Sequence, residues 1–162
     1  TLVLKGNISL SRAVFPEGTA GVQLDILARM HLWQEGLNYG HGTGHGVGFF
    51  LNVHEPPQGF TPNPRGERGE TTFLPGMLTS NEPGFYKPGE YGIRIENLEL
   101  CVEHQATDDG RFFAFEPLTL FPIDLKLADL SRLAQEEKAW LNDYHSKVLQ
   151  ELTPLLKKEE QA

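Results

Sequence analysis

Apolar residues recur at spacings of three and four through residues 1–37, which is the period of a helix that packs on one face. One series runs over residues 4–14 and should end at the Pro-Glu-Gly turn of residues 16–18. A second series runs over residues 22–33, and Gly36 supplies a stop. The pattern therefore predicts two helices with their apolar faces in the core.

The pattern changes to that of strands and turns from Gly40 to Phe121. Strand-like runs cover residues 47–53, 77–82 and 91–103. The link over residues 54–76 holds five prolines and several charges, so we expect a surface excursion rather than a hairpin turn. The chain as a whole is predicted to be one α+β domain over residues 1–162, with helices over 1–37, strands over 40–121 and C-terminal helices over 124–157.

The composition restricts the partners. The net charge is −8, and 14 basic residues are scattered among 22 acidic ones, so we expect no nucleic-acid partner. No run of about 18 apolar residues occurs, and we expect no membrane partner. Cys101 is the single cysteine and lies in an apolar run, which predicts a small buried side chain in a reducing compartment. The chain begins at Thr1 inside an apparent helix, so we expect it to be part of a longer polypeptide.

Glycine occupies every even position from Gly40 to Gly48. Five glycines in a helix would cost roughly 5 kcal/mol relative to alanine, so extended structure is expected. A period of two then places His41, Thr43 and His45 on one side, and the bare glycines let another backbone, a substrate or a metal approach closely.

These histidines admit two other interpretations. A zinc-protease helix needs a glutamate directly after the first histidine, and position 42 is glycine, so that interpretation is set aside. A purely structural role, with glycines in a tight sheet contact and the histidines hydrogen-bonded, stays open for the segment alone. His54 follows a strand-like run and would by itself be an ordinary loop histidine.

Two glutamates lie at the ends of predicted strands. Glu82 precedes a Pro-Gly turn, where a solvated acid is the alternative. Strand alternation places Glu96 on the face of the apolar positions 98, 100 and 102, with Glu99 and Glu103 opposite it in solvent. A buried carboxylate needs a compensating cation, either Arg94 two residues away or a metal ion. One histidine and two glutamates suit hard divalent ions such as manganese or magnesium.

Three stretches, residues 41–56, 81–86 and 92–97, follow one another in a fixed order. They resemble the pita-bread metallopeptidases, which include aminopeptidase P, prolidase, methionine aminopeptidase and creatinase, and the first is similar to the cytosolic type of Xaa-Pro aminopeptidase. The similarity extends to residues 140–145. It implies the C-terminal portion of a pita-bread (creatinase/aminopeptidase) fold, a curved antiparallel sheet flanked by helices.

The resemblance also assigns roles. It implies metal ligands His45, Glu82 and Glu96, catalytic residues His41, His54 and Glu82, and a supporting residue Arg94. In this scheme Glu96 bridges two ions, and Glu82 also takes a proton from the attacking water. The two catalytic histidines orient the substrate and assist proton transfer, while the arginine steadies the carboxylates.

The activity implied is the release of the N-terminal residue from peptides with proline in second position. The implied cofactors are two divalent metal ions, with Mn2+ expected, and the implied location is cytoplasmic. We also expect a homo-oligomer, most simply a dimer. A prolidase-type dipeptidase and a non-catalytic pita-bread module that binds peptides or proteins remain as alternatives.

The family site has two further aspartate ligands, in an Asp-Ser-Gly-like and an Asp-x-Thr-Arg-like strand, and neither motif occurs in this sequence. Three ligands cannot fill two coordination spheres of about five or six positions each. We therefore expect the 162 residues alone to bind metal weakly and to be inactive. We also expect an exposed apolar surface where the other half of the fold packs, and self-association through it.

Overall fold

The computed structural model describes residues 1–50, 52–64 and 67–160. Their contacts form two compact units, one of residues 2–118 and one of Thr1 with the residues from 119 onward. The larger unit contains every residue predicted for the site. The single domain predicted over residues 1–162 stays a prediction.

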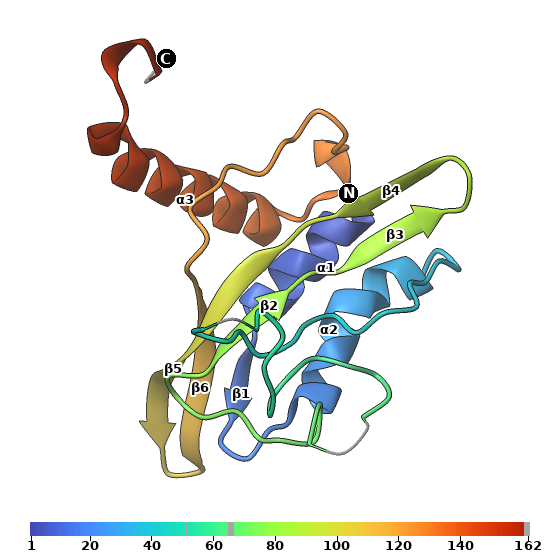
Figure 1. Ribbon diagram of the computed structural model, residues 1–162, viewed down its shortest axis with the longest axis vertical. Coiled ribbons are helices and arrows are strands. Elements are labelled where there is room, and N and C mark those ends of the chain that lie inside the picture. The colour runs from blue at the N-terminus through green and yellow to red at the C-terminus, as the bar shows by residue number, and fades with distance from the viewer. Residues whose placement is uncertain (51, 65–66, 161–162) are drawn as a thin grey trace. The chain divides into compact units, whose positions relative to one another are not determined.

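Two helices begin the larger unit. Helix α1 spans Leu2–Ser11 and helix α2 spans Gly21–Trp33. They lie side by side (Figure 1), and at Gly6 an added Cβ atom would lie 2.2 Å from the carbonyl oxygen of Ala28. Gly36, with a φ of +71°, follows the end of α2. Both predicted helices are confirmed, although the first is shorter than predicted.

The segment after α1 is a strand. Strand β1 spans Val14–Pro16 and pairs antiparallel with β6, which spans Gly110–Pro117. Val14 is 48% exposed and Phe15 is 3% exposed, so burial alternates with a period of two. The prediction that the first helix includes Val14 is wrong, because an outward-facing strand residue happens to fall four positions after Leu10.

The main sheet is antiparallel in the order β1-β6-β5-β2, with β2 at Leu78–Asn81 and β5 at Asn97–Thr107. A separate hairpin of β3 (Gly84–Lys87) and β4 (Tyr91–Arg94) extends away from it (Figure 1). Helix α1 contacts β2 and β6. The α+β class, with an antiparallel sheet and flanking helices, is confirmed.

The core of the larger unit is rich in phenylalanine, and two of these rings come from the link over residues 54–76. Phe60 and Phe73 are fully buried and stack with their centroids 5.1 Å apart. The prediction of a surface excursion is therefore wrong at these two anchors. Cys101 lies in the same core cluster, and its burial raises the pKa of the thiol to about 11. It is a neutral packing residue, as predicted.

Burial along β5 is opposite to the prediction. Glu99 is 0% exposed, whereas Glu96 precedes the strand and is exposed. Glu99 accepts hydrogen bonds from the Ser11 hydroxyl and the Asn81 side-chain amide, which compensate its burial. The face predicted for Glu96 is wrong because β4 ends before this residue and β5 starts after it, so strand alternation does not run through it.

The described residues of the smaller unit form helix α3 over Gln135–Leu152 and three short 3-10 turns. The turns are η1 at Leu130–Arg132, η2 at Thr153–Leu155 and η3 at Lys158–Glu160. The predicted C-terminal helices are confirmed from Leu130, whereas residues 124–129 are not helical. No helix among the described residues is long and apolar enough to cross a membrane.

Candidate metal centre

The glycine-rich segment, residues 40–48, runs between two neighbouring stretches of backbone. On one side, Gly44 exchanges backbone hydrogen bonds of 3.1 and 3.0 Å with Phe60. On the other, the carbonyl of Thr43 accepts from the N–H of Glu82 at 2.8 Å. Bonding to both sides is typical of an extended chain, as the glycine alternation predicted.

The glycines are required by this close packing. A Cβ atom on Gly44 would lie 1.8 Å from the carbonyl oxygen of Ser80, and one on Gly46 would lie 2.2 Å from that of Glu55. No side chain fits at either position unless the backbone moves. The segment is therefore held tightly against β2, the strand that leads to Glu82.

The chain reverses after the glycine segment. Val47 and His54 form an isolated bridge, and the N–H of Gly48 donates to the carbonyl of Val53 at 3.3 Å. The strand predicted over residues 47–53 is therefore wrong for its described residues, while Leu51 lies outside them. The reversal brings His54 back to His45, with ring centroids 4.2 Å apart.

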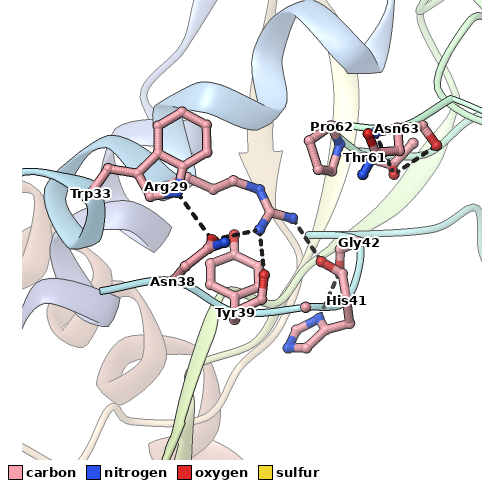
Figure 2. A pocket seen from close by; sticks show the side chains of 10 residues that line it. Arg29, Trp33, Asn38, Tyr39, His41, Gly42, Thr61, Pro62 and Asn63 are labelled. Atoms are coloured by element: carbon pink, nitrogen blue, oxygen red, sulfur yellow. Dashed lines mark hydrogen bonds between the residues drawn. The ribbon is translucent and has the colours of Figure 1, made fainter. Parts of the chain in front are cut away.

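Helix α2 anchors the start of the glycine segment through Arg29 (Figure 2). The guanidinium donates to the carbonyls of Tyr39 at 2.8 Å and His41 at 2.6 Å, and it pairs with Asp25 at 2.5 Å. Asp25 also accepts from the Thr43 hydroxyl at 2.7 Å. Sequence reasoning missed this network, although its signal was present: an acid and a base four apart within an apolar helical stripe.

A cavity of about 440 Å³ opens beside this anchor and is lined in part by Trp33, Thr61 and His41 (Figure 2). The Arg29 guanidinium lies 3.9 Å from the centroid of the Tyr39 ring. Burial raises the pKa of the Tyr39 phenol to about 12, although a hydrogen bond with Thr43 acts in the opposite direction. The phenol is therefore neutral at physiological pH.

His45 and Glu82 form the centre of the candidate site. The Nδ1 atom of His45 lies 2.9 Å from the carbonyl oxygen of Gly46, which can only accept, so Nδ1 carries a proton. In the neutral ring Nε2 then presents a lone pair toward the Glu82 carboxylate oxygen, 3.2 Å away. Two acceptor atoms at this distance require a cation or a proton between them, and imidazole with carboxylate fits a divalent metal ion.

Arg94 pairs with Glu82, with its Nη1 atom 3.3 Å from Oε2. Its Nε atom donates to the Tyr86 phenol oxygen at 2.9 Å. Partial burial lowers the pKa of Arg94, but the phenol oxygen and the carboxylates of Glu82 and Glu96 outweigh it, and the pKa is raised above its usual value. The alternative of an Arg94–Glu96 ion pair is not found among the described residues, where the guanidinium contacts Glu82 instead.

His41 joins the same chain of contacts. Its Nδ1 atom donates to the carbonyl oxygen of Gly42 at 2.7 Å, so in the neutral ring Nε2 accepts from the Tyr86 hydroxyl at 3.0 Å. With a neutral His41 ring, the phenol donates to His41 while it accepts from Arg94. The sequence did not predict a role for Tyr86, because the β3–β4 hairpin is what places its hydroxyl beside His41 and Arg94.

Glu96 lies opposite Glu82, between the end of one strand pair and the start of the next. Asn81 pairs with Asn97 and Gly84 pairs with Arg94, so the two-residue intervals 82–83 and 95–96 face each other between these pairs. Among the described residues, no group of three or more His, Cys, Asp or Glu side chains is placed to hold a metal ion. The structure thus brings together His45, Glu82, Arg94 and His54, while Glu96 is exposed beside them.

Family models match nearly the whole chain. Residues 1–103 match metallopeptidase family M24, and residues 111–162 match the C-terminal region of the same peptidase family. A probable Xaa-Pro aminopeptidase P of Arthroderma otae is 49% identical over 98% of this chain and 26% of its own length. One from Tuber melanosporum is 52% identical over 93% of this chain and 24% of its own length.

Solved structures give the same result. The X-prolyl aminopeptidase of Caenorhabditis elegans, a cytosolic enzyme with a di-nuclear active site, matches with a TM-score of 0.88 and 46% identity over 100% of this chain and 26% of that chain. A Xaa-Pro dipeptidase from Bacillus anthracis matches with a TM-score of 0.56 and 33% identity over 76% of this chain and 30% of that chain. The chain therefore spans about a quarter of the length of the aminopeptidases it matches.

Proposed function

The chain belongs to metallopeptidase family M24, and we propose that it forms the C-terminal part of the catalytic domain of a metal-dependent Xaa-Pro aminopeptidase. The fold class predicted for it, a portion of a pita-bread fold, is confirmed by its structural relatives. One observation carries the proposal: His45 Nε2, with Nδ1 committed to Gly46, faces the Glu82 carboxylate at 3.2 Å. This pair is suited to hold a cation and stands on two segments joined by backbone hydrogen bonds.

The proposed cofactors are two divalent ions, Mn2+ in our proposal, held by His45, Glu82 and Glu96. When bound, such ions would lower the pKa of a shared water and polarise the scissile carbonyl. Glu82 is proposed to take a proton from that water as well; one of its oxygens faces His45 and the other faces Arg94. Arg94 holds this carboxylate in one orientation. The proposed site is completed by the two aspartates that the family supplies from a preceding segment.

His41 and His54 are proposed to act on the substrate rather than on the ions. His41 Nε2 is turned toward the Tyr86 hydroxyl, so a proton can pass between the two groups. His54 lies against the ring of His45 on an exposed turn, where a peptide can reach it. The proposed substrates are peptides with proline in second position, which each release their N-terminal residue.

The alternatives differ in how well the relatives support them. A prolidase-type dipeptidase is the second candidate, since a Xaa-Pro dipeptidase shares the fold over 76% of the chain. The aminopeptidase match covers the whole chain at higher identity, which favours the first candidate. A non-catalytic binding module is disfavoured because the His45–Glu82 pair and both accessory histidines are present.

Turnover of a Xaa-Pro tripeptide tests the proposal. An intact enzyme, made of these residues and the preceding segment that its relatives have, should release the first residue with Mn2+, and Glu82→Ala should abolish the release. Glu90→Gln is the matched control, because it removes an exposed acid that pairs with Lys87 outside the site. The 162 residues alone should be inactive with Mn2+. Activity of this piece above its own Glu82→Ala variant would refute that expectation, and an inactive intact enzyme would refute the proposed function.

We also propose a cytoplasmic location and a homo-oligomer, most simply a dimer. The C. elegans relative is described as cytosolic, which supports the location. Phe49, Phe50 and Val53 are 98%, 69% and 60% exposed, and this apolar turn supports self-association of the piece. Light scattering of the piece at high concentration measures this self-association, and a clean monomer would count against it.

A further inference from the structure

Two strand pairs meet where the two glutamates lie, and between them the N–H of Ile95 donates to the carbonyl of Pro83 at 3.3 Å. The pairs on either side are Asn81 with Asn97 and Gly84 with Arg94, and the intervals between them hold Glu82 and Glu96. Pro83 has no N–H to donate across this interval, so the carbonyl of Ile95 opposite it needs another donor. The donor here comes from α1.

Asn7 supplies this donor to both intervals. Its Nδ2 atom lies 3.0 Å from the carbonyl oxygen of Asn81 and 3.3 Å from that of Ile95. These are the residues directly before Glu82 and Glu96. Since a carbonyl oxygen can only accept, the amide orientation follows from the contacts, and both N–H groups of the side chain are used.

The contact is buried and reciprocal. Asn7 and Asn81 are each 0% exposed, and the side-chain amide of Asn81 donates back to the carbonyl of Asn7 at 3.0 Å. The same amide lies 3.1 Å from Glu99 Oε1. Helix α1 is therefore joined to the end of β2 by two buried amide contacts in opposite directions, and one of the two amides also reaches across to the other glutamate interval.

We propose that Asn7 is a positioning residue that sets the distance between Glu82 and Glu96 by holding the carbonyls before them. The proposal rests on the proposed function, in which these glutamates are ligands of one dinuclear site. Asn7 touches neither carboxylate. It acts on the two backbone segments, which in this interval are otherwise joined by the hydrogen bond from Ile95 to Pro83, so its loss loosens the spacing of two ligands that must reach the same pair of ions.

The test compares variants of the intact enzyme. Asn7→Leu keeps a similar volume and removes both donors, and Asn7→Ala leaves room for water and gives a second variant if the first does not fold. Both should weaken binding of the second Mn2+ ion by about 10- to 100-fold, as measured by calorimetry. The electron paramagnetic resonance signal of the coupled Mn2+ pair should give way to that of isolated ions.

Ser9→Ala is the matched control. It removes a hydroxyl of the same helix that lies 2.9 Å from His31 on α2, away from the glutamates, and should leave the second Mn2+ ion bound as in the parent. Wild-type affinity and a coupled signal in a folded Asn7 variant would overturn the proposal while leaving the function intact. A parent enzyme that binds fewer than two ions would instead overturn the proposed function, and this inference with it.

Discussion

Replacement of Arg29 by methionine is the most direct test of how the glycine segment is held. Arg29 is 1% exposed, and its guanidinium contacts the Asp25 carboxylate and the carbonyls of Tyr39 and His41. Methionine fills a similar volume but provides no donor. The buried carboxylate, also 1% exposed, would keep only its hydrogen bond from Thr43.

The expected loss follows from this geometry. Removing one partner of a buried ion pair costs about 3–5 kcal/mol, because the remaining charge is left without compensation. A typical domain has a free energy of unfolding of about 5–15 kcal/mol, so the loss is a large fraction of the total. For a chain of this length, each kcal/mol lowers the melting temperature by about 2–4 °C, which gives a decrease of roughly 10 °C.

Urea denaturation followed by circular dichroism measures this loss. Arg111→Met is the matched control, since Arg111 pairs with Glu17 and Glu103 on the surface and its side chain is 48% exposed. Its loss should cost less than about 1 kcal/mol. If Arg29→Met were no more destabilising than Arg111→Met, the reasoning about the buried anchor would be refuted.

A double variant separates the charge from the packing. Asp25→Leu combined with Arg29→Met removes both charges, so it should cost less than the sum of the two single variants. Contacting residues commonly show interaction energies of about 0.5–3 kcal/mol in such a cycle. Simple additivity would show that the ion pair is not what couples α2 to the glycine segment.

Two further predictions concern other buried positions. Gly44→Ala should destabilise the chain strongly, because its Cβ atom would lie 1.8 Å from the Ser80 carbonyl oxygen. Gly40→Ala is the control, since a Cβ atom there meets nothing within 4 Å, and equal thermal stability of the two variants would contradict the prediction. The pKa of Cys101 is raised from 9.0 to about 11 by burial, so the unfolded thiol ionises first and the free energy of unfolding should fall as pH rises through that interval. Cys101→Ala should remove this part of the pH dependence in urea titrations, and an unchanged slope would argue against it.

The sequence predicts those parts of the fold that depend on local periodicity. Helix α2 matches its apolar series closely, and β2 lies within the run that ends at Glu82. Val14 shows the limit of this approach, because a spacing of four fits a helix even when the residue lies outward on a strand. The anchors Phe60 and Phe73 were missed because a proline-rich link gives no periodic signal for two isolated core residues.

In the candidate site too, residues in local motifs could be predicted and long-range contacts could not. His45 and Glu82 were predicted from their motifs, and the structure places them 3.2 Å apart although they are 37 positions apart in sequence. The environments of Glu96 and Glu99 could not be predicted, because they depend on where β4 ends and β5 begins and on donors from α1. Ser11 lies 88 positions from Glu99, so no local pattern contains this contact.

The buried anchors around the site share one property, which is that they act on backbone carbonyl oxygens. Arg29 holds the carbonyls of Tyr39 and His41, and Asn7 holds those before the two glutamates. The segments that present imidazole and carboxylate groups are therefore positioned without using the atoms that would bind a cation. If the proposed function is correct, the conformational entropy of ordering the ligands is lost when the chain folds and not when the metal binds. The affinity for the ions is then higher. It also follows that the most damaging substitutions include residues with no contact to an ion, and that they act by displacing ligands that are themselves unchanged.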